Sequence, residues 1–237
     1  MKCILLAAGK GKRLLPYTKI KPKCMLDLGG TNLIEIWLKK VKKMNFEEII
    51  INTHHLNEIL EEEIHRVTNS LCMNNVSIVY EKNLLGTAGT LWSLKDRLND
   101  NFFVINTDVF AEINLDEIKF HFLNNNSICL LAFDYRLDTT GCGIIELSKN
   151  SFIDNFIEKN HANEPGFVYS GILIFSKKIF KILPFKEFSK KNYIGLDTGY
   201  HVLPKILDAT KGYKINGKVI DLRDENKLFE LKKYINN

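Results

Sequence analysis

Four short stretches of the chain are mostly apolar and end at glycine or polar residues: 2–8, 49–51, 76–80 and 102–106. Such runs are typical of strands buried within a parallel sheet. Three intervening stretches have the length and residue pattern of helices that cover a sheet: 32–44, 57–69 and 87–98. The alternation predicts an α/β fold with a doubly wound, mostly parallel sheet and right-handed crossovers.

Polar residues follow each of these predicted strands. Gly9 follows the first, His54 and His55 the second, Glu81 the third and Asp108 the fourth. Ligands bind at the carboxyl ends of the strands in sheets of this kind, so we expect these residues to converge on one edge. We interpret the two histidines as strand-end structure, because adjacent residues of a strand point to opposite faces.

The pattern changes from about residue 125, where shorter strands follow one another with few helices between them. We predict these strands at 127–134, 143–147, 154–157 and 171–175, and closing helices at 197–210 and 224–235. This half therefore predicts a second, more antiparallel lobe. We treat 1–237 as a single domain, with 1–124 as its core and 125–237 as a second lobe with closing helices.

Composition narrows the classes of function. The 237 residues are 45% hydrophobic, and 33 basic against 28 acidic residues give a net charge of +5, which favours encounter with a phosphorylated substrate. No helix-turn-helix, zinc-finger or aromatic RNA-binding signature is present, so nucleic acid is not an expected partner. The five cysteines are widely spaced without a CxxC pair, which indicates a reducing cytoplasm. The first apolar run is too short for a signal peptide or a membrane span.

A glycine-rich loop follows the first predicted strand. Gly9 and Gly11 let backbone N–H groups approach a phosphate closely, and Lys12 and Arg13 supply positive charge. The spacing is neither that of a P-loop nor GxGxxG. Lys23 follows a proline in the same loop and is a second candidate phosphate contact. Taken alone, the loop fits a tight turn with exposed lysines equally well.

Read together, these pieces resemble a known family. Leu-Ala-Ala-Gly-Lys-Gly-Lys-Arg-Leu at 6–14, followed by Lys-Pro-Lys-Cys-Met at 21–25, resembles the nucleotide-binding signature of the sugar-1-phosphate nucleotidyltransferases. Further segments resemble motifs of that family in the same order: 81–89, 106–108, 156–159, 169–175 and 219–221. The segments 52–56 and 84–91 resemble the mannose-1-phosphate and heptose-1-phosphate guanylyltransferase branch.

The resemblance implies a Rossmann-like sheet with a smaller sugar-binding lobe, so that 1–124 would be the nucleotide-binding core and 125–237 the acceptor-binding lobe with closing helices. It also implies transfer of a nucleoside monophosphate from a nucleoside triphosphate to a sugar 1-phosphate, with release of pyrophosphate. Mg²⁺ would be the cofactor, bound by Asp108 and Asp221. The catalytic residues would be Arg13, Lys23 and Asp108.

The resemblance also assigns binding roles. The nucleotide-binding residues would be Leu6, Ala8, Gly9, Gly11, Lys12, Arg13, Lys23, Glu81, Gly86, Thr87 and Asp108. The sugar-binding residues would be Gly143, Glu158, Lys159 and Gly171. Glu81 would accept hydrogen bonds from guanine N1–H and N2–H, or from cytosine N4–H, which favours GTP.

Other interpretations stay open at this point. Asp108 could be a helix cap, Asp221 could form a surface pair with Arg223, and the glycines of the second half could mark turns or bulges. The tryptophan and the Gly-Thr that normally surround the late aspartate are absent. A UTP- or CTP-dependent enzyme with another phosphorylated acceptor, or an inactive nucleotide-binding regulator, is therefore the alternative. The sequence permits a homo-oligomer without indicating one.

Overall fold

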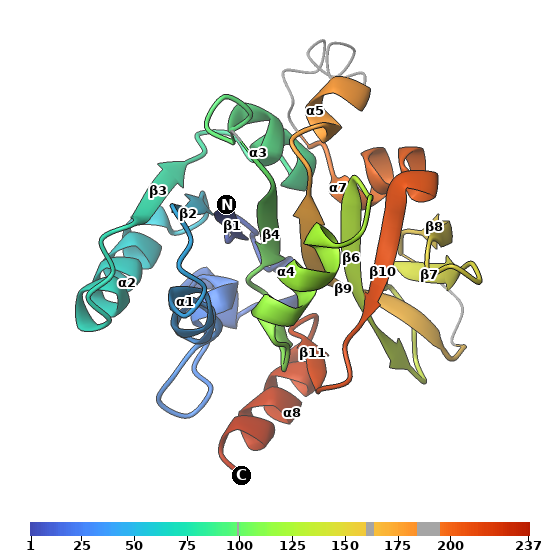
Figure 1. The fold of residues 1–237 in the computed structure, drawn as a ribbon. Coiled ribbons are helices and arrows are strands. Elements are labelled where there is room, and N and C mark those ends of the chain that lie inside the picture. The colour runs from blue at the N-terminus through green and yellow to red at the C-terminus, as the bar shows by residue number, and fades with distance from the viewer. Residues whose placement is uncertain (99, 160–163, 184–194) are drawn as a thin grey trace. The chain divides into compact units, whose positions relative to one another are not determined.

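The computed structural model describes residues 1–98, 100–159, 164–183 and 195–237 (Figure 1). The chain forms two compact units, each assembled from separate segments. The first unit comprises Met1–Leu84, Ile105–Leu115 and Gly217–Asn237, and the second comprises Leu85–Val104 and Asp116–Asn216. The assignment of nucleotide binding to 1–124 and acceptor binding to 125–237 stays a prediction.

The first unit contains three of the parallel strands that the apolar runs predict, together with the last two residues of the fourth. Strands β1 (Lys2–Leu6), β2 (Ile49–Thr53) and β3 (Val76–Tyr80) lie side by side in that order. At the end of β4 (Phe102–Asn106), the Thr107 backbone N–H donates to the Leu6 carbonyl over 3.2 Å. The carboxyl ends of these strands therefore meet at one edge of the sheet, as predicted.

The helices of the first unit follow from their caps and apolar stripes. Helix α1 (Leu33–Lys42) begins where the Asn32 side chain accepts from the Glu35 backbone N–H, and it buries one apolar face. Helix α2 (Asn57–Ser70) buries a second such face, and α8 (Glu225–Ile235) begins at the capping side chain of Asp224. All three confirm helices expected from the sequence.

Two three-residue strands of the first unit were not predicted. Strands β5 (Val109–Ala111) and β11 (Val219–Asp221) pair antiparallel, with Asp221 opposite Val109. Strands this short leave too few positions for an alternating pattern to show in the sequence. Their pairing fixes the late aspartate beside the chain that leaves β4.

The second unit is largely antiparallel, as expected. Strand β6 (Cys129–Arg136) pairs antiparallel with β9 (Gly166–Phe175), and β7 (Ile144–Leu147) pairs antiparallel with both β8 (Ile153–Ile157) and β9. Strand β10 (Thr210–Lys214) pairs parallel with β6. The sequence did not predict β10, because lysines and a glycine interrupt its apolar pattern.

Helices of the second unit differ from those expected. Helix α3 (Thr87–Ser93) ends before residue 98, and the sequence did not predict α4 (Leu115–Leu123) or α5 (Ile179–Ile182). The helix expected at 197–210 is wrong as a continuous element, because it consists of α7 (Thr198–His201) and two separate 3-10 turns. Pro204 lies in the first of those turns, and its ring prevents the helix from continuing. Within the described ranges, no helix is long and apolar enough to cross a membrane.

Candidate active site

The glycine-rich loop leaves β1 through two buried alanines and reaches the surface at Gly9. Gly11 has a φ of +59°, and a Cβ there would lie 2.7 Å from Cγ2 of Thr18, so only glycine fits. The 3-10 turn Lys12–Leu14 follows, with Leu14 buried and Lys12 and Arg13 exposed. The loop thus presents two cations from an anchored turn.

Lys23, Asp108 and Asp221 face one another in the first unit. The Lys23 Nζ lies 2.6 Å from Oδ2 of Asp108 and 4.0 Å from Oδ1 of Asp221. The Lys23 side chain is only 12% exposed. Burial alone would lower the pKa of Lys23, but the two carboxylates outweigh it and raise that pKa. The lysine is therefore a fixed positive charge between two acids.

Backbone contacts explain why these side chains meet. Lys23 begins a 3-10 turn in which Cys24 is buried. Thr107 is buried and its Oγ1 donates to the Leu6 carbonyl over 2.8 Å, which holds the chain before Asp108 against β1. The Leu222 backbone N–H donates to the Asp108 carbonyl over 2.9 Å. Asp108 lies between two strands, β4 and β5, and caps no helix.

The carboxylates of Asp108 and Asp221 form a fitting pair of ligands for a divalent cation. Both face the same Lys23 ammonium, and carboxylate oxygens are the ligands that Mg²⁺ prefers. No group of three or more histidine, cysteine or acidic side chains with metal-binding geometry occurs in the described residues. Two carboxylates together with phosphate oxygens and water form an ordinary site for a hard cation.

Glu81 is held at the end of β3 with its side chain buried, 4% exposed. The Asn52 Nδ2 donates to Oε1 of Glu81 over 2.8 Å, and the Asn52 Oδ1 accepts from the Ala7 backbone N–H over 2.8 Å. His54 and His55 bond to different segments, through the carbonyls of Glu81 and Thr18. This agrees with their interpretation as strand-end structure.

Gly86 and Thr87 belong to the second unit. Gly86 has a φ of +82°, and a Cβ there would collide with the Leu196 carbonyl. The Thr87 hydroxyl accepts from the Thr198 backbone N–H over 2.6 Å and lies 3.3 Å from Oδ2 of Asp197. Both residues fix the beginning of α3 against the segment that enters α7. Their predicted contact with a nucleotide stays a prediction.

Glu158 rests against glycines of the second unit. Its Oε2 would lie 3.1 Å from a Cβ at Gly143, and it would collide with a Cβ at Gly199, beside the Asp197 carboxylate. Burial and the charge of Asp197 raise the pKa of Glu158 to about 7, although Lys159 opposes the shift. The absence of side chains at the two glycines is what makes room for this carboxylate.

Two other predicted sugar-binding residues have structural features of their own. Lys159 is exposed, and its Nζ lies 5.2 Å from the centre of the Tyr200 ring. Gly171 lies in β9 with a φ of +73°, where the β6–β9 register shifts. Gly171 is thus a bulge glycine. The neighbouring Ser170 is buried and donates to Oδ1 of Asp134 over 2.9 Å.

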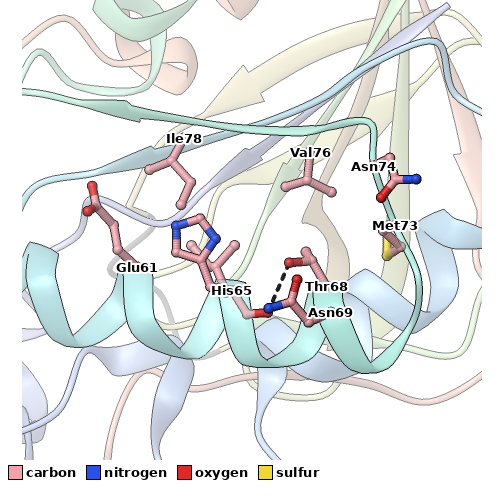
Figure 2. A pocket seen from close by; sticks show the side chains of 9 residues that line it. Glu61, His65, Thr68, Asn69, Met73, Asn74, Val76 and Ile78 are labelled. Atoms are coloured by element: carbon pink, nitrogen blue, oxygen red, sulfur yellow. Dashed lines mark hydrogen bonds between the residues drawn. The ribbon is translucent and has the colours of Figure 1, made fainter.

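A pocket of about 270 Å³ lies elsewhere in the first unit. It lies between α2 and β3, and Figure 2 shows His65, Thr68 and Asn69 of the helix facing Val76 and Ile78 of the strand. None of the residues predicted for catalysis or binding lines it. The predicted site and this pocket therefore share no residue.

Sequence reasoning missed two polar residues beside the predicted ones. Asn52 follows the apolar run of β2. A polar residue in such a buried strand is a signal from which the sequence could have identified it. Asp197 caps α7 by accepting from the Gly199 backbone N–H and lies near Glu158. It follows residues 184–194, which lie outside the described ranges, and no pattern in the sequence distinguished it.

The profile of the Nucleotidyl transferase family matches residues 2–221, and the chain belongs to this family. The matched range includes the second unit, most of the first unit and every residue predicted for the site. Family and fold therefore agree with the motifs at the strand ends.

Individual relatives are distant. The chain is 26% identical to the bifunctional protein GlmU of Methanocaldococcus jannaschii over 99% of this chain and 54% of that relative. It is 27% identical to the D-glycero-alpha-D-manno-heptose 1-phosphate guanylyltransferase of Campylobacter jejuni over 81% of this chain and 86% of that protein. The chain spans about half the length of several curated relatives that it matches.

A solved structure with the same fold is a putative glucose-1-phosphate thymidylyltransferase from Bacillus anthracis in complex with a sucrose. It superimposes with a TM-score of 0.86 at 21% identity, covering 99% of this chain and 94% of that one. The likeness confirms the expected fold class, a mixed α/β structure of the type found in nucleotidyltransferases.

Proposed function

We propose that this protein transfers a nucleoside monophosphate to a sugar 1-phosphate. An oxygen of the sugar phosphate attacks the α-phosphorus of the triphosphate, the bond to the β-phosphate oxygen breaks, and pyrophosphate leaves. The observation that carries this proposal is the position of Lys23 between Asp108 and Asp221. In phosphoryl transfer, such a site acts mainly through positioning and through stabilisation of charge.

Different residues of the first unit bind different parts of the triphosphate. The exposed Arg13 and Lys12 bind phosphate oxygens, and Arg13 stabilises the charge that develops on the leaving pyrophosphate. Gly9 and Gly11 allow the backbone of the loop, with Leu6 and Ala8 before it, to approach the nucleotide. Lys23 binds and orients the phosphate that reacts.

A divalent cation, which we propose to be Mg²⁺, would be held by Asp108 and Asp221. When bound, it neutralises phosphate charge and polarises the bonds to phosphorus. Substrate oxygens and water would occupy the remaining coordination positions.

The residues of the second unit that we propose for the acceptor are Gly143, Glu158, Lys159 and Gly171. The Glu158 carboxylate accepts hydrogen bonds from sugar hydroxyls, and Lys159 binds the acceptor phosphate. The two glycines offer backbone groups to the sugar ring. Gly86 and Thr87 would complete the nucleotide contacts.

GTP is the nucleotide we favour, because Glu81 can accept two hydrogen bonds from the N1–H and N2–H of guanine. The heptose 1-phosphate guanylyltransferase among the relatives supports this choice. A putative glucose-1-phosphate thymidylyltransferase has the same fold, so the fold alone does not support one base over another. Because nucleoside triphosphates are cytoplasmic substrates, we propose the cytoplasm as the site of action.

A specific observation favours a second kind of acceptor. The carboxylates of Glu158 and Asp197 both lie against Gly199. Paired carboxylates favour a cationic group. A phosphorylated amine or choline, activated with CTP or UTP, is the alternative substrate.

Pyrophosphate release tests the proposal. GTP, UTP, CTP and ATP are each combined with a panel of sugar 1-phosphates and with phosphocholine in the presence of Mg²⁺. We expect release with one pair, and a loss of about 100-fold in kcat/KM for Lys23→Ala because a fixed cation at the reacting phosphate is removed. The exposed Lys19 of the same loop provides the matched control, Lys19→Ala, which should retain activity.

The outcome separates the alternatives. If the protein binds nucleotide but releases no pyrophosphate with any pair of substrates, the transferase proposal is overturned and an inactive regulator is favoured. Equal activity of the Lys23→Ala and Lys19→Ala variants would show that the lysine between the aspartates has no part in the reaction.

A further inference from the structure

Asn52 joins three strand ends of the first unit. It is the fourth residue of β2, it is 3% exposed, and it pairs in register with Leu6 of β1 and Val79 of β3. Its Oδ1 accepts from the Ala7 backbone N–H over 2.8 Å, and its Nδ2 donates to Oε1 of Glu81 over 2.8 Å. One amide thus bridges the beginning of the glycine-rich loop and the Glu81 carboxylate.

The two contacts have opposite polarity, and this explains the choice of asparagine. The Ala7 N–H requires an acceptor, and the Glu81 carboxylate requires a donor. An amide of this length offers one of each, whereas a carboxylate offers acceptors only. Because the side chain is buried, water is poorly placed to replace a contact that is lost.

The surrounding chain holds Asn52 in this position. The Glu81 backbone N–H donates to the Thr53 carbonyl over 2.8 Å, and His54 Nδ1 lies 2.7 Å from the Glu81 carbonyl. These contacts fix the backbone at the end of β3, and the Asn52 amide adds a contact to the side chain itself. The orientation of the Glu81 carboxylate is therefore coupled to the loop that begins at Ala7.

We propose that Asn52 is a positioning residue for nucleobase discrimination. Its amide holds the Glu81 carboxylate in a fixed orientation relative to the phosphate-binding loop. The base and the triphosphate of the same nucleotide can then contact Glu81 and the loop simultaneously. This inference rests on the proposed function, in which Glu81 contacts the base. Asn52 itself acts through Glu81 and through the backbone of Ala7.

The test is equilibrium binding of GTP, UTP, CTP and ATP without an acceptor. Asn52→Asp keeps the acceptor for Ala7 but removes the donor to Glu81 and places a second negative charge there. Discrimination is the Kd of the second-best nucleotide divided by the Kd of the preferred one. This ratio should fall about tenfold in the variant. Inorganic tripolyphosphate, which has no base, should bind the variant nearly as well as it binds the wild type.

Asn75→Asp is the matched control. Asn75 precedes β3 at the opposite end of the sheet, and its Nδ2 donates to the Phe46 carbonyl over 2.7 Å. This substitution also removes a donor but should leave nucleobase discrimination unchanged. Asn52→Ser is a second variant for the case in which Asn52→Asp does not fold; it removes both contacts without a charge and should also lose discrimination.

Two outcomes would contradict the inference in different ways. Wild-type discrimination in either folded Asn52 variant would overturn the role of Asn52 and leave the proposed function intact. Failure of the wild-type protein to bind any of the four nucleotides would overturn the proposed function, and this inference with it.

Discussion

Asp108 and Glu158 are two carboxyl groups that their surroundings shift in opposite directions. Burial would raise the pKa of Asp108, but the Lys23 ammonium and the Arg13 guanidinium outweigh burial and lower that pKa. Glu158 has no such dominant cation, so burial and Asp197 raise its pKa to about 7. At neutral pH the first is therefore ionised, and the second is close to half protonated.

Glu158 should make the stability of the protein depend on pH. The folded state holds its proton more tightly than the unfolded chain, whose glutamates titrate near 4.5. The resulting stabilisation is complete below that value and is lost as the pH rises through about 7. Glu158→Gln should therefore gain about 1 kcal/mol over the wild type between pH 5 and 8, after allowance for solvent screening. Urea denaturation at both pH values measures this gain.

The control for this pH dependence is Glu146→Gln, which changes an exposed carboxyl group of β7 in the same unit. Its difference from the wild type in unfolding free energy should stay constant between pH 5 and 8. A constant difference for Glu158→Gln as well would show that this carboxyl group titrates normally in the folded protein.

At the scale of elements, the sequence predicted the strands and helices whose buried residues follow a regular pattern. The apolar runs of β1 to β4 and the amphipathic stripe of α1 were recognisable because burial on both faces or on one face leaves a regular pattern. Strand β11 was not recognisable, because three residues carry no period. The helix expected at 197–210 is interrupted at Pro204, a residue that is itself a sequence signal for a helix break.

The β5–β11 pair yields a prediction about the element that holds Asp221. Gly217 packs on the Glu112 backbone, and a Cβ there would collide with the Glu112 carbonyl and lie 2.6 Å from the Glu112 Cβ. Gly217→Ala should therefore force the two strands apart and lower the unfolding free energy by about 1–3 kcal/mol. Chemical denaturation measures the loss.

Gly166→Ala is the matched control, because a Cβ at Gly166 would meet Thr139 at an ordinary distance of 3.5 Å. It should change stability by less than about 0.5 kcal/mol. If both alanine variants are as stable as the wild type, the close approach of Gly217 to Glu112 does not constrain the pairing of β5 and β11.

At the scale of the whole molecule, the two compact units divide the predicted site in a way that the sequence did not indicate. Nine of the eleven predicted nucleotide-binding residues belong to the first unit, whereas Gly86 and Thr87 belong to the second. All four predicted sugar-binding residues belong to the second unit. The motifs gave the order of the site residues, but the return of the chain to the first unit at Gly217 depends on long-range pairing that no local pattern encodes.

The thiols of the whole chain provide a final prediction. All five cysteines are free; Cys72 is exposed, and the other four are buried. Burial raises the pKa of the Cys24 thiol to about 12, so that little of the reactive thiolate forms at neutral pH. Alkylation of the native protein without reductant should therefore modify one thiol quickly, whereas alkylation in denaturant should modify five. Intact-mass spectrometry counts both, and Cys72→Ser should remove the fast reaction. Fewer than five modified thiols in denaturant would reveal a disulfide and contradict the expectation of a reducing compartment.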